Sequence, residues 1–307
     1  MPTIRIGTRA SRLARWQADW TAQQLRNLGA QVEIILITTD GDQLTGSIQN
    51  SPERGLFTKR IQQALLAKQI DLAVHSLKDL PTEPISGLSL AAVPPRENPS
   101  DVLISRTGQT LADLPSHSKI GTGSWRRQSQ LLHHRADISV ADIRGNVDTR
   151  LNKLRAGDYD AIVLAFAGLE RLGFADQITQ ILDFDIILPA VGQGALGLET
   201  RSEDAATRDI VSRLNDANAM AAVTAERSLL LTIGGGCLAP VGALGSIADD
   251  KLSLRACVLT HDGERRVDST GTDSLENAAD LGASVARHLI EQGAQELISH
   301  SRQESPQ

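Results

Sequence analysis

Short apolar runs alternate with segments whose apolar residues recur at helical spacing over the first two thirds of the chain. The apolar runs predict strands at 3–7, 32–38, 70–74, 88–93, 101–105, 119–122, 138–143 and 159–165. The helical spacing predicts helices at 11–28, 57–68, 124–135, 147–155, 168–172, 205–214 and 217–231. This alternation is typical of α/β lobes with mostly parallel sheets and helices on their faces.

Two crossovers divide the predicted elements into lobes. A proline-rich linker at 94–100 ends the first series, and 189–198 returns to it, as expected for a two-hinged, clam-like pair. After the glycine-rich stretch 234–245, strands near 252–259 and 265–269 and a helix at 275–291 predict a small α+β third domain. The expected domains are 1–96 with 194–215 (domain 1), 97–193 (domain 2) and 216–307 (domain 3).

Composition and charge exclude some classes of binding partner. The 307 residues carry a formal net charge of −6 and only 3% aromatic residues, which argues against general nucleic-acid binding and base stacking. The start of the chain lacks the features of a secretory signal, and no apolar run is long enough for a membrane span. We therefore expect a cytoplasmic monomer without a membrane or nucleic-acid partner, in a reducing compartment where its two cysteines form no disulfide.

Two motifs are set aside. Gly192-Gln-Gly194-Ala-Leu-Gly197 matches a dinucleotide fingerprint by letter but lacks the strand–turn–helix setting that the fingerprint requires. His133 and His134 have no cysteine or carboxylate partners at ligand spacing, so we expect no metal site.

The stretch from Ile70 to Pro81 places a polar turn directly after a buried strand. Ligands of open α/β sheets bind beyond the carboxyl ends of strands, so Lys78 and Asp79 are candidate site residues there. An ordinary solvated turn is the alternative, because such turns are common.

Three predicted strand-to-helix junctions carry arginines, although cations are mildly unfavourable at helix N-termini. They are Gly7-Thr-Arg-Ala-Ser-Arg12, Gly121-Thr-Gly-Ser-Trp-Arg-Arg127 and Arg144-Gly-Asn146 with Arg150 one turn later. Helix N-termini and arginine forks both bind carboxylate or phosphate, so converging junctions would bind a ligand with several negative charges. The alternative is that these arginines point outward and pair with surface acids.

The two cysteines have different settings. Cys257 lies in an apolar strand pattern and is expected to be a core residue. Cys237 follows three glycines, whose flexibility costs folding entropy, so the loop either presents its thiol or allows a close backbone approach. A loop cysteine without a special role remains open at this point.

Together these residues resemble the porphobilinogen deaminase (hydroxymethylbilane synthase) family over almost the whole chain. The motifs that carry the resemblance are Thr8-Arg-Ala-Ser11, Gly55-Leu-Phe-Thr-Lys59, His75-Ser-Leu-Lys-Asp-Leu-Pro81, Gly121-Thr-Gly-Ser-Trp-Arg-Arg-Gln128, Arg144-Gly-Asn146, Pro189-Ala-Val-Gly-Gln-Gly194 and Gly236-Cys237.

The resemblance implies a fold, a reaction and a cofactor. It implies two lobes like those of periplasmic binding proteins and a third domain with the cofactor cysteine. The implied transferase joins four porphobilinogen molecules head to tail, releases ammonia and forms hydroxymethylbilane for tetrapyrrole and haem biosynthesis. It works on a dipyrromethane primer held by a thioether to Cys237.

Roles follow residue by residue from the resemblance. Asp79 would be catalytic, stabilising the cationic azafulvene left when ammonia departs and assisting proton transfer. The remaining residues would bind carboxylates: for the cofactor Lys78, Ser76, Thr122, Ser124, Arg126, Arg127 and Arg144 beside Cys237, and for the substrate Arg9, Ser11, Arg150, Lys59 and Gln193.

The chain departs from common family residues at Arg12, Arg54, Gly123, Trp125 and Leu238. These departures put in doubt carboxylate contacts of the Arg54 loop and the Gly123 turn, but not the reaction. The alternative function is a two-lobed anion-binding protein without catalysis.

Overall fold

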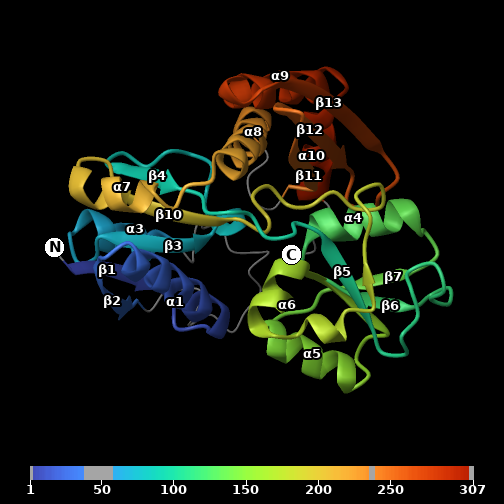
Figure 1. Ribbon diagram of the computed structural model, residues 1–307. Coiled ribbons are helices and arrows are strands. Elements are labelled where there is room, and N and C mark those ends of the chain that lie inside the picture. Colours follow the sequence, from blue (N-terminus) through green and yellow to red (C-terminus); the bar gives the residue numbers. More distant parts are fainter. Residues whose placement is uncertain (1–2, 38–57, 235–238, 304–307) are drawn as a thin grey trace.

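The computed structural model describes residues 3–37, 58–234 and 239–303, which form three bodies around a common junction (Figure 1). Two bodies are α/β lobes, each with a five-stranded sheet, and the third pairs a three-stranded sheet with helices. The predicted fold class is confirmed.

The first lobe has the strand order β2-β1-β3-β10-β4. Its elements are β1 (Thr3–Thr8), α1 (Arg12–Asn27), β2 (Gln31–Leu36), α3 (Lys59–Leu66), β3 (Leu72–Ser76), the 3₁₀ turn η2 (Leu77–Asp79), β4 (Leu88–Ala92), β10 (Leu196–Arg201) and α7 (Ala205–Ser212). Apolar side chains of β1 and β3 pack against Ala18, Ala22 and Leu25 on one face of α1, as the helical spacing predicted.

The second lobe has the strand order β7-β6-β8-β5-β9. Its elements are β5 (Asp101–Ser105), β6 (Lys119–Gly121), α4 (Trp125–His134), β7 (Ser139–Ala141), α5 (Val147–Arg155), β8 (Ala161–Ala165), α6 (Phe166–Leu172), η3 (Ala175–Gln177) and β9 (Gln180–Ile181). All three arginine-bearing segments are strand-to-helix junctions, namely β1–α1, β6–α4 and β7–α5.

In each five-stranded sheet four strands run in one direction and a single strand runs against them, so the sheets are mostly parallel, as expected. In the first sheet β10 runs antiparallel to β3 and β4, and in the second β5 runs antiparallel to β8 and β9. The reversed strands are β5 and β10. Each begins where a crossover enters its lobe and runs away from the junction of the lobes, whereas β3 and β8 run toward the junction and end at it. The register pairs Leu196 with Ser76 and Asp101 with Ala165.

The third body contains a strand and a helix that the sequence pattern missed, β11 and α10. Its elements are α8 (Ala217–Ile233), β11 (Val241–Ala248), β12 (Lys251–Leu259), β13 (Arg266–Ser274), η4 (Leu275–Asn277), α9 (Ala278–Glu291) and α10 (Ala294–Gln303). The glycines of β11 concealed its strand character, and they are needed because a Cβ at Gly245 would lie 2.8 Å from the Ala222 carbonyl oxygen of α8. Cys257 is buried in this body, as expected.

A buried carboxylate joins the third body to both crossovers. Glu226 of α8 accepts hydrogen bonds from the backbone N–H groups of Gly192 (2.7 Å) and Gly245 (2.8 Å). It also forms an ion pair with Arg96 at 2.7 Å, and Arg96 donates to the carbonyl of Gln193 at 2.9 Å. Hydrogen bonds therefore connect the two crossovers to α8, the helix that precedes Cys237 in the sequence.

Within the described ranges, none of the helices combines the length and apolar character that crossing a membrane requires.

Candidate active site at the junction of the lobes

The candidate site begins at the carboxyl end of β3, where the strand extends two residues further than predicted. His75 and Ser76 belong to β3, and the polar turn is η2. Leu77 anchors this turn because its side chain is 1% exposed and its N–H donates to the carbonyl of Ala195 at 3.0 Å. With Leu77 held inward, Asp79 is exposed at the junction.

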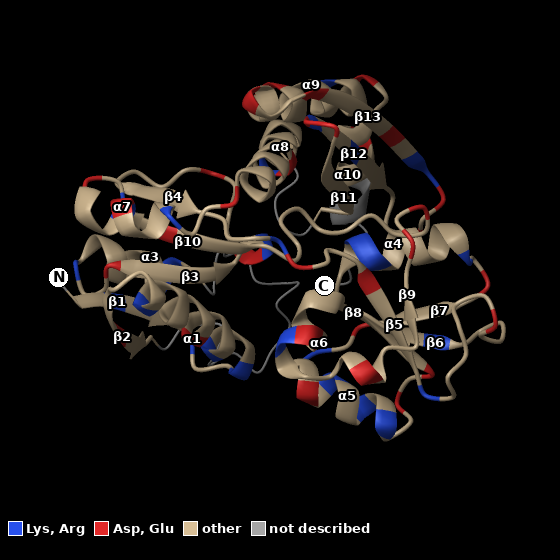
Figure 2. Cartoon of the chain, viewed as in Figure 1, with Lys and Arg blue, Asp and Glu red and all other residues tan. Residues whose placement is uncertain are grey.

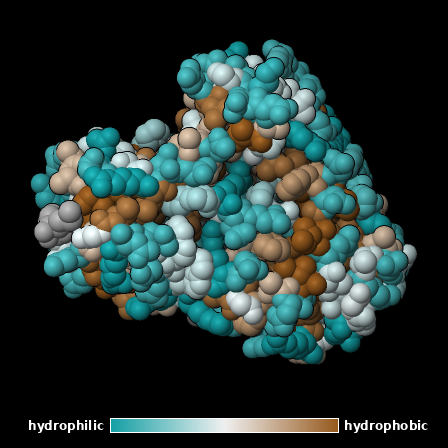
Figure 3. All heavy atoms as spheres, viewed as in Figure 1, coloured by the Kyte–Doolittle hydropathy of each residue, from teal (hydrophilic) through white to brown (hydrophobic). Residues whose placement is uncertain are grey.

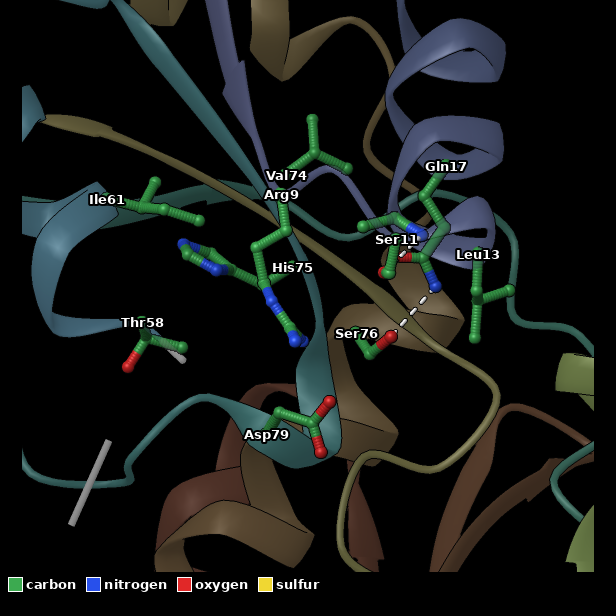
Figure 4. Close-up of a pocket in the computed structure, with 11 residues that line it drawn as sticks. Arg9, Ser11, Leu13, Gln17, Thr58, Ile61, Val74, His75, Ser76 and Asp79 are labelled. Atoms are coloured by element: carbon green, nitrogen blue, oxygen red, sulfur yellow. Dashed lines mark hydrogen bonds between the residues drawn. The ribbon is translucent and has the colours of Figure 1, made fainter. Parts of the chain in front are cut away.

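A pocket joins Asp79 to the β1–α1 junction. Arg9, Ser11, His75 and Ser76 line it together with Asp79. Figure 4 shows Arg9 extending from its strand end toward Ser76 and Asp79. Ser11 also caps α1 by accepting from the Ala14 N–H, while Ser76 accepts from the Gln17 side chain at 2.8 Å. The structure thus brings the predicted catalytic carboxylate and three predicted ligand-binding residues into one pocket.

His75 belongs to a buried hydrogen-bond group behind this pocket. Its Nε2 lies 3.1 Å from Glu199 Oε2, and the Gln62 amide donates to both oxygens of Glu199. Glu199 faces inward from β10, and nothing in its local sequence signalled this buried interaction.

The side chain of Lys78, in η2, contacts the returning crossover, which in turn contacts the second lobe. Its Nζ lies 3.5 Å from the side-chain oxygen of Gln193, and the Gln193 amide donates to the Pro99 carbonyl (2.7 Å) and to Asp101 Oδ1 (3.0 Å). Burial, with repulsion from Arg127, lowers the pKa of Lys78 to about 8. The lysine of this turn is therefore crowded by cations.

Arg126 and Arg127 of α4 lie on the other side of Asp101. Arg126 NH1 donates to Asp101 Oδ2 and to the Leu188 carbonyl, each at 2.6 Å. Arg127 Nε donates to Asp101 Oδ1 at 2.9 Å, and its NH1 donates to the Val163 carbonyl at 3.0 Å. Burial would raise the pKa of Asp101, but the two guanidinium charges outweigh burial and hold that pKa far below its usual range.

Asp101 is a site residue that sequence analysis missed. It is fully buried and is the first residue of the apolar strand β5. An aspartate at the start of a buried strand was the available signal. Figure 2 shows basic residues on the first turn of α4 and an acidic residue at the adjacent end of β5.

The β7–α5 junction contributes a looser group of cations. Arg144 pairs with Asp142 at 2.6 Å, and Arg150 Nε donates to the Gly145 carbonyl at 2.8 Å. Burial, with repulsion from Arg127, lowers the pKa of Arg150 to about 10. The alternative of outward arginines with surface acids holds for Arg12, whose exposed side chain pairs with Asp148 at 3.0 Å, and in part for Arg144, whose partner Asp142 is exposed.

The remaining predicted residues occupy different settings. Thr122 is buried and its hydroxyl accepts from the Ser124 N–H at 3.3 Å, so these two shape the β6–α4 turn. Lys59 is exposed at the start of α3, next to the pocket residue Thr58. Cys237 lies outside the described residues, which resume at Ala239 after ending at Gly234.

Three departures from common family residues have visible settings. A Cβ at Gly123 would lie 3.0 Å from Asp142 Oδ1, so glycine allows that carboxylate to approach. Trp125 packs edge-on against His261 of the third body with ring centroids 5.4 Å apart. Arg12 bridges the lobes through Asp148 and the Leu172 carbonyl. Arg54 and Leu238 lie outside the described residues.

Family models match residues in both lobes and in the third body. A family model described as "Porphobilinogen deaminase, dipyromethane cofactor binding domain" matches residues 4–209, and "Porphobilinogen deaminase, C-terminal domain" matches 220–291. The chain belongs to the porphobilinogen deaminase family. Family members are transferases, and their cofactor is dipyrromethane.

Full-length relatives carry the same family name. The porphobilinogen deaminase of Pelotomaculum thermopropionicum is 46% identical over 304 residues, covering 98% of this chain and 97% of that protein. That of Syntrophotalea carbinolica is 44% identical over 299 residues, covering 96% and 95%. Deaminase relatives therefore align along both lobes and the third body.

Solved structures give weaker matches. An ancestral cationic amino acid solute-binding protein is 15% identical with a TM-score of 0.43, covering 69% of this chain and 87% of that one. A periplasmic substrate-binding protein of an ABC transporter from Coxiella burnetii is 14% identical with a TM-score of 0.42, covering 69% and 91%. No ligand is inferred from them.

Proposed function

We propose that this chain joins four porphobilinogen molecules head to tail, releases one ammonia per molecule and yields hydroxymethylbilane. The observation that carries the proposal is an exposed carboxylate, Asp79, beside a junction where cations outnumber carboxylates. The cations there are Lys78, Arg126, Arg127, Arg144 and Arg150. The described carboxylates that act on them are Asp79 and Asp101 near Lys78 and Asp142 near Arg144 and Arg150. Each pyrrole unit carries an acetate and a propionate, so the growing product is a polyanion suited to this charge.

The dipyrromethane cofactor fits the residues present. The buried Nε of Arg126 has no hydrogen-bond partner in the described part of the structure, as expected of a donor that serves an anionic group. Lys78, Ser76, Thr122, Ser124, Arg126, Arg127 and Arg144 would hold the cofactor, and a thioether would join it to Cys237. When bound, the cofactor supplies the pyrrole carbon that receives the first substrate.

Asp79 is assigned to the substrate's chemistry. The aminomethyl group reacts in its protonated form: its carbon–nitrogen bond breaks, both bonding electrons go to nitrogen, neutral ammonia leaves, and the pyrrole keeps the positive charge as an azafulvene cation. The Asp79 carboxylate stabilises this positive charge, in the manner of an oxyanion hole with the signs reversed. It then accepts the proton lost from the attacked pyrrole carbon once the new carbon–carbon bond has formed.

The substrate's carboxylates are assigned to Arg9, Ser11 and Arg150, and also to Lys59 at the edge of the pocket. Arg9 and Ser11 line the same pocket as Asp79, so a carboxylate anchored by them would leave the aminomethyl group close to Asp79. Figure 3 shows hydrophilic residues where the two lobes and the third body meet, which suits a charged, hydrated substrate. A cytoplasmic location and a monomeric state stay predictions.

The test uses the purified full-length chain with porphobilinogen. We expect release of ammonia and formation of hydroxymethylbilane, together with a dipyrrole mass increment on the protein that Cys237→Ser lacks. Reversible binding of a small carboxylate, with no ammonia released from porphobilinogen, would contradict the proposal and support the non-catalytic anion-binding alternative.

A further inference from the structure

We infer that Asp101 and Gln193 are positioning residues that join Lys78 of the first lobe and the arginine pair of the second lobe into one carboxylate-binding site. This inference rests on the proposed function, and neither role follows from the family motifs. A continuous series of contacts supports this inference. Asp101 accepts hydrogen bonds from Arg126, Arg127 and Gln193, and Gln193 in turn contacts Lys78.

The geometry of Asp101 explains why its role is positioning. Its Oδ2 accepts from Arg126, and its Oδ1 accepts from both Arg127 and Gln193. Its side chain is fully buried, so it cannot contact a ligand in the junction. Asp101 instead fixes the orientation of the Arg126 and Arg127 guanidinium groups, whose side chains extend from the same turn of α4.

Asp101 also offsets the repulsion among the cations. Three positive groups, Lys78, Arg126 and Arg127, would be strongly unfavourable together in a buried setting without a carboxylate. Burial disfavours the protonated form of Lys78 most, and Arg127 and Arg126 also disfavour it, whereas Asp79 and Asp101 favour it. One buried carboxylate leaves this group short of negative charge, which a carboxylate of the pyrrole chain would supply.

Gln193 connects the lobes because it lies on the returning crossover. Its amide nitrogen donates to Pro99 on the other crossover and to Asp101, and its oxygen faces the Lys78 amine. The side chain is 1% exposed, and these contacts engage both ends of its amide. In this inference Gln193 acts on the cofactor carboxylates through Lys78, in place of the direct substrate contact that the resemblance implied.

Asp101→Asn tests the inference, and Asp71→Asn is its matched control. Asp71 also sits between two arginines, Arg5 and Arg201, but precedes β3 at the opposite end of the strand. The probe is the pH dependence of Lys78 acetylation by acetic anhydride, read by mass spectrometry. The charged groups that face Lys78 are Arg126, Arg127, Asp79 and Asp101.

We expect Asp101→Asn to lower the pKa of Lys78 by about half a pH unit or more and to reduce hydroxymethylbilane formation at pH 8 by at least about tenfold. Asp71→Asn should leave both unchanged. Identical Lys78 titration in the two variants would overturn the inference. If the wild-type chain itself makes no hydroxymethylbilane, the proposed function fails, and the Lys78 titration still decides the role of Asp101.

Gln193→Met provides a second test of the bridge between the lobes if the Asp101→Asn chain does not fold. The substitution keeps the length and charge of the side chain but removes its hydrogen bonds. We expect a loss of turnover of at least about tenfold, with a melting temperature no lower than that of Asp71→Asn. Normal turnover by a folded Gln193→Met chain would overturn the bridging role.

Discussion

Carboxylates lie among cations at both ends of β3, but the charges are balanced at one end and unbalanced at the other. At the start of the strand, Asp71 accepts from Arg5 Nε at 2.9 Å and from Arg201 NH2 at 2.9 Å. Arg201 also pairs with Asp204 at 2.6 Å, so two carboxylates meet two arginines. Burial would raise the pKa of Asp71, but these hydrogen bonds outweigh it and lower the pKa to about 2.

At the other end of β3, the charges do not balance. Lys78 has its pKa lowered to about 8, and the buried Nε of Arg126 has no partner among the described residues. A closed network with matched charges stabilises the native state, whereas an incomplete one carries a cost that a ligand relieves. This difference supports the proposal that the end of β3 with unmatched charges binds the ligand.

The largest expected effect comes from removing the carboxylate at the incomplete end. Asp79→Ala should fold, since Asp79 is exposed, and should lose about three orders of magnitude or more of turnover because the substrate cation loses its stabilising charge. Steady-state formation of hydroxymethylbilane measures this. Turnover within about tenfold of the wild type would reject the catalytic role.

A smaller loss is expected when an arginine fork is replaced without changing its charge. Arg127→Lys keeps the cation but cannot bond both Asp101 and the Val163 carbonyl as the guanidinium does. We expect kcat/KM for porphobilinogen to fall by about 10–100-fold. Arg5→Lys, at the balanced end of β3, is the control and should leave kcat/KM unchanged.

At the balanced end the expected effect is on stability. Asp71→Asn should reduce the free energy of unfolding by about 2 kcal/mol at neutral pH. Since the folded pKa is depressed, this contribution is present above about pH 4 and is lost as the pH falls toward 2. Urea unfolding at pH 7 and pH 3 measures it, and an equal deficit at both values would contradict the assignment.

The smallest effect concerns the exposed bridge between the lobes. Arg12→Ala removes the pair with Asp148, in which both side chains are more than a third exposed. Such pairs contribute about 1 kcal/mol or less, so the melting temperature should change little. A loss of stability as large as that of Asp71→Asn would show that this bridge is a major link between the lobes.

Local patterns predicted most of the elements. Apolar runs located β1, β5 and β8, and helical spacing placed the starts of α1 and α5 within one residue of the observed starts, where Ser11 and Asn146 accept backbone hydrogen bonds. The pattern missed β11 because its glycines suit a close approach to α8 and lower its strand propensity. The antiparallel direction of β10 was also missed, since direction depends on where the returning crossover enters the sheet.

The site was predictable to the extent that its residues carry charge next to strand ends. The motifs alone predicted Asp79, Lys78 and the arginine junctions as candidate site residues, because each of these follows a recognisable strand. They could not reveal Asp101 or Glu199, because a buried carboxylate is recognised by its partners, which lie far away in sequence. Long-range pairing thus explains what the sequence analysis missed.

The most direct test of the central claim is intact-protein mass spectrometry after brief exposure to porphobilinogen. The wild-type chain should show a ladder of masses, each step one porphobilinogen less one ammonia, and Asp79→Asn should show no added steps under the same conditions. The same ladder at the same rate in Asp79→Asn, or no ladder in the wild type, would contradict the account.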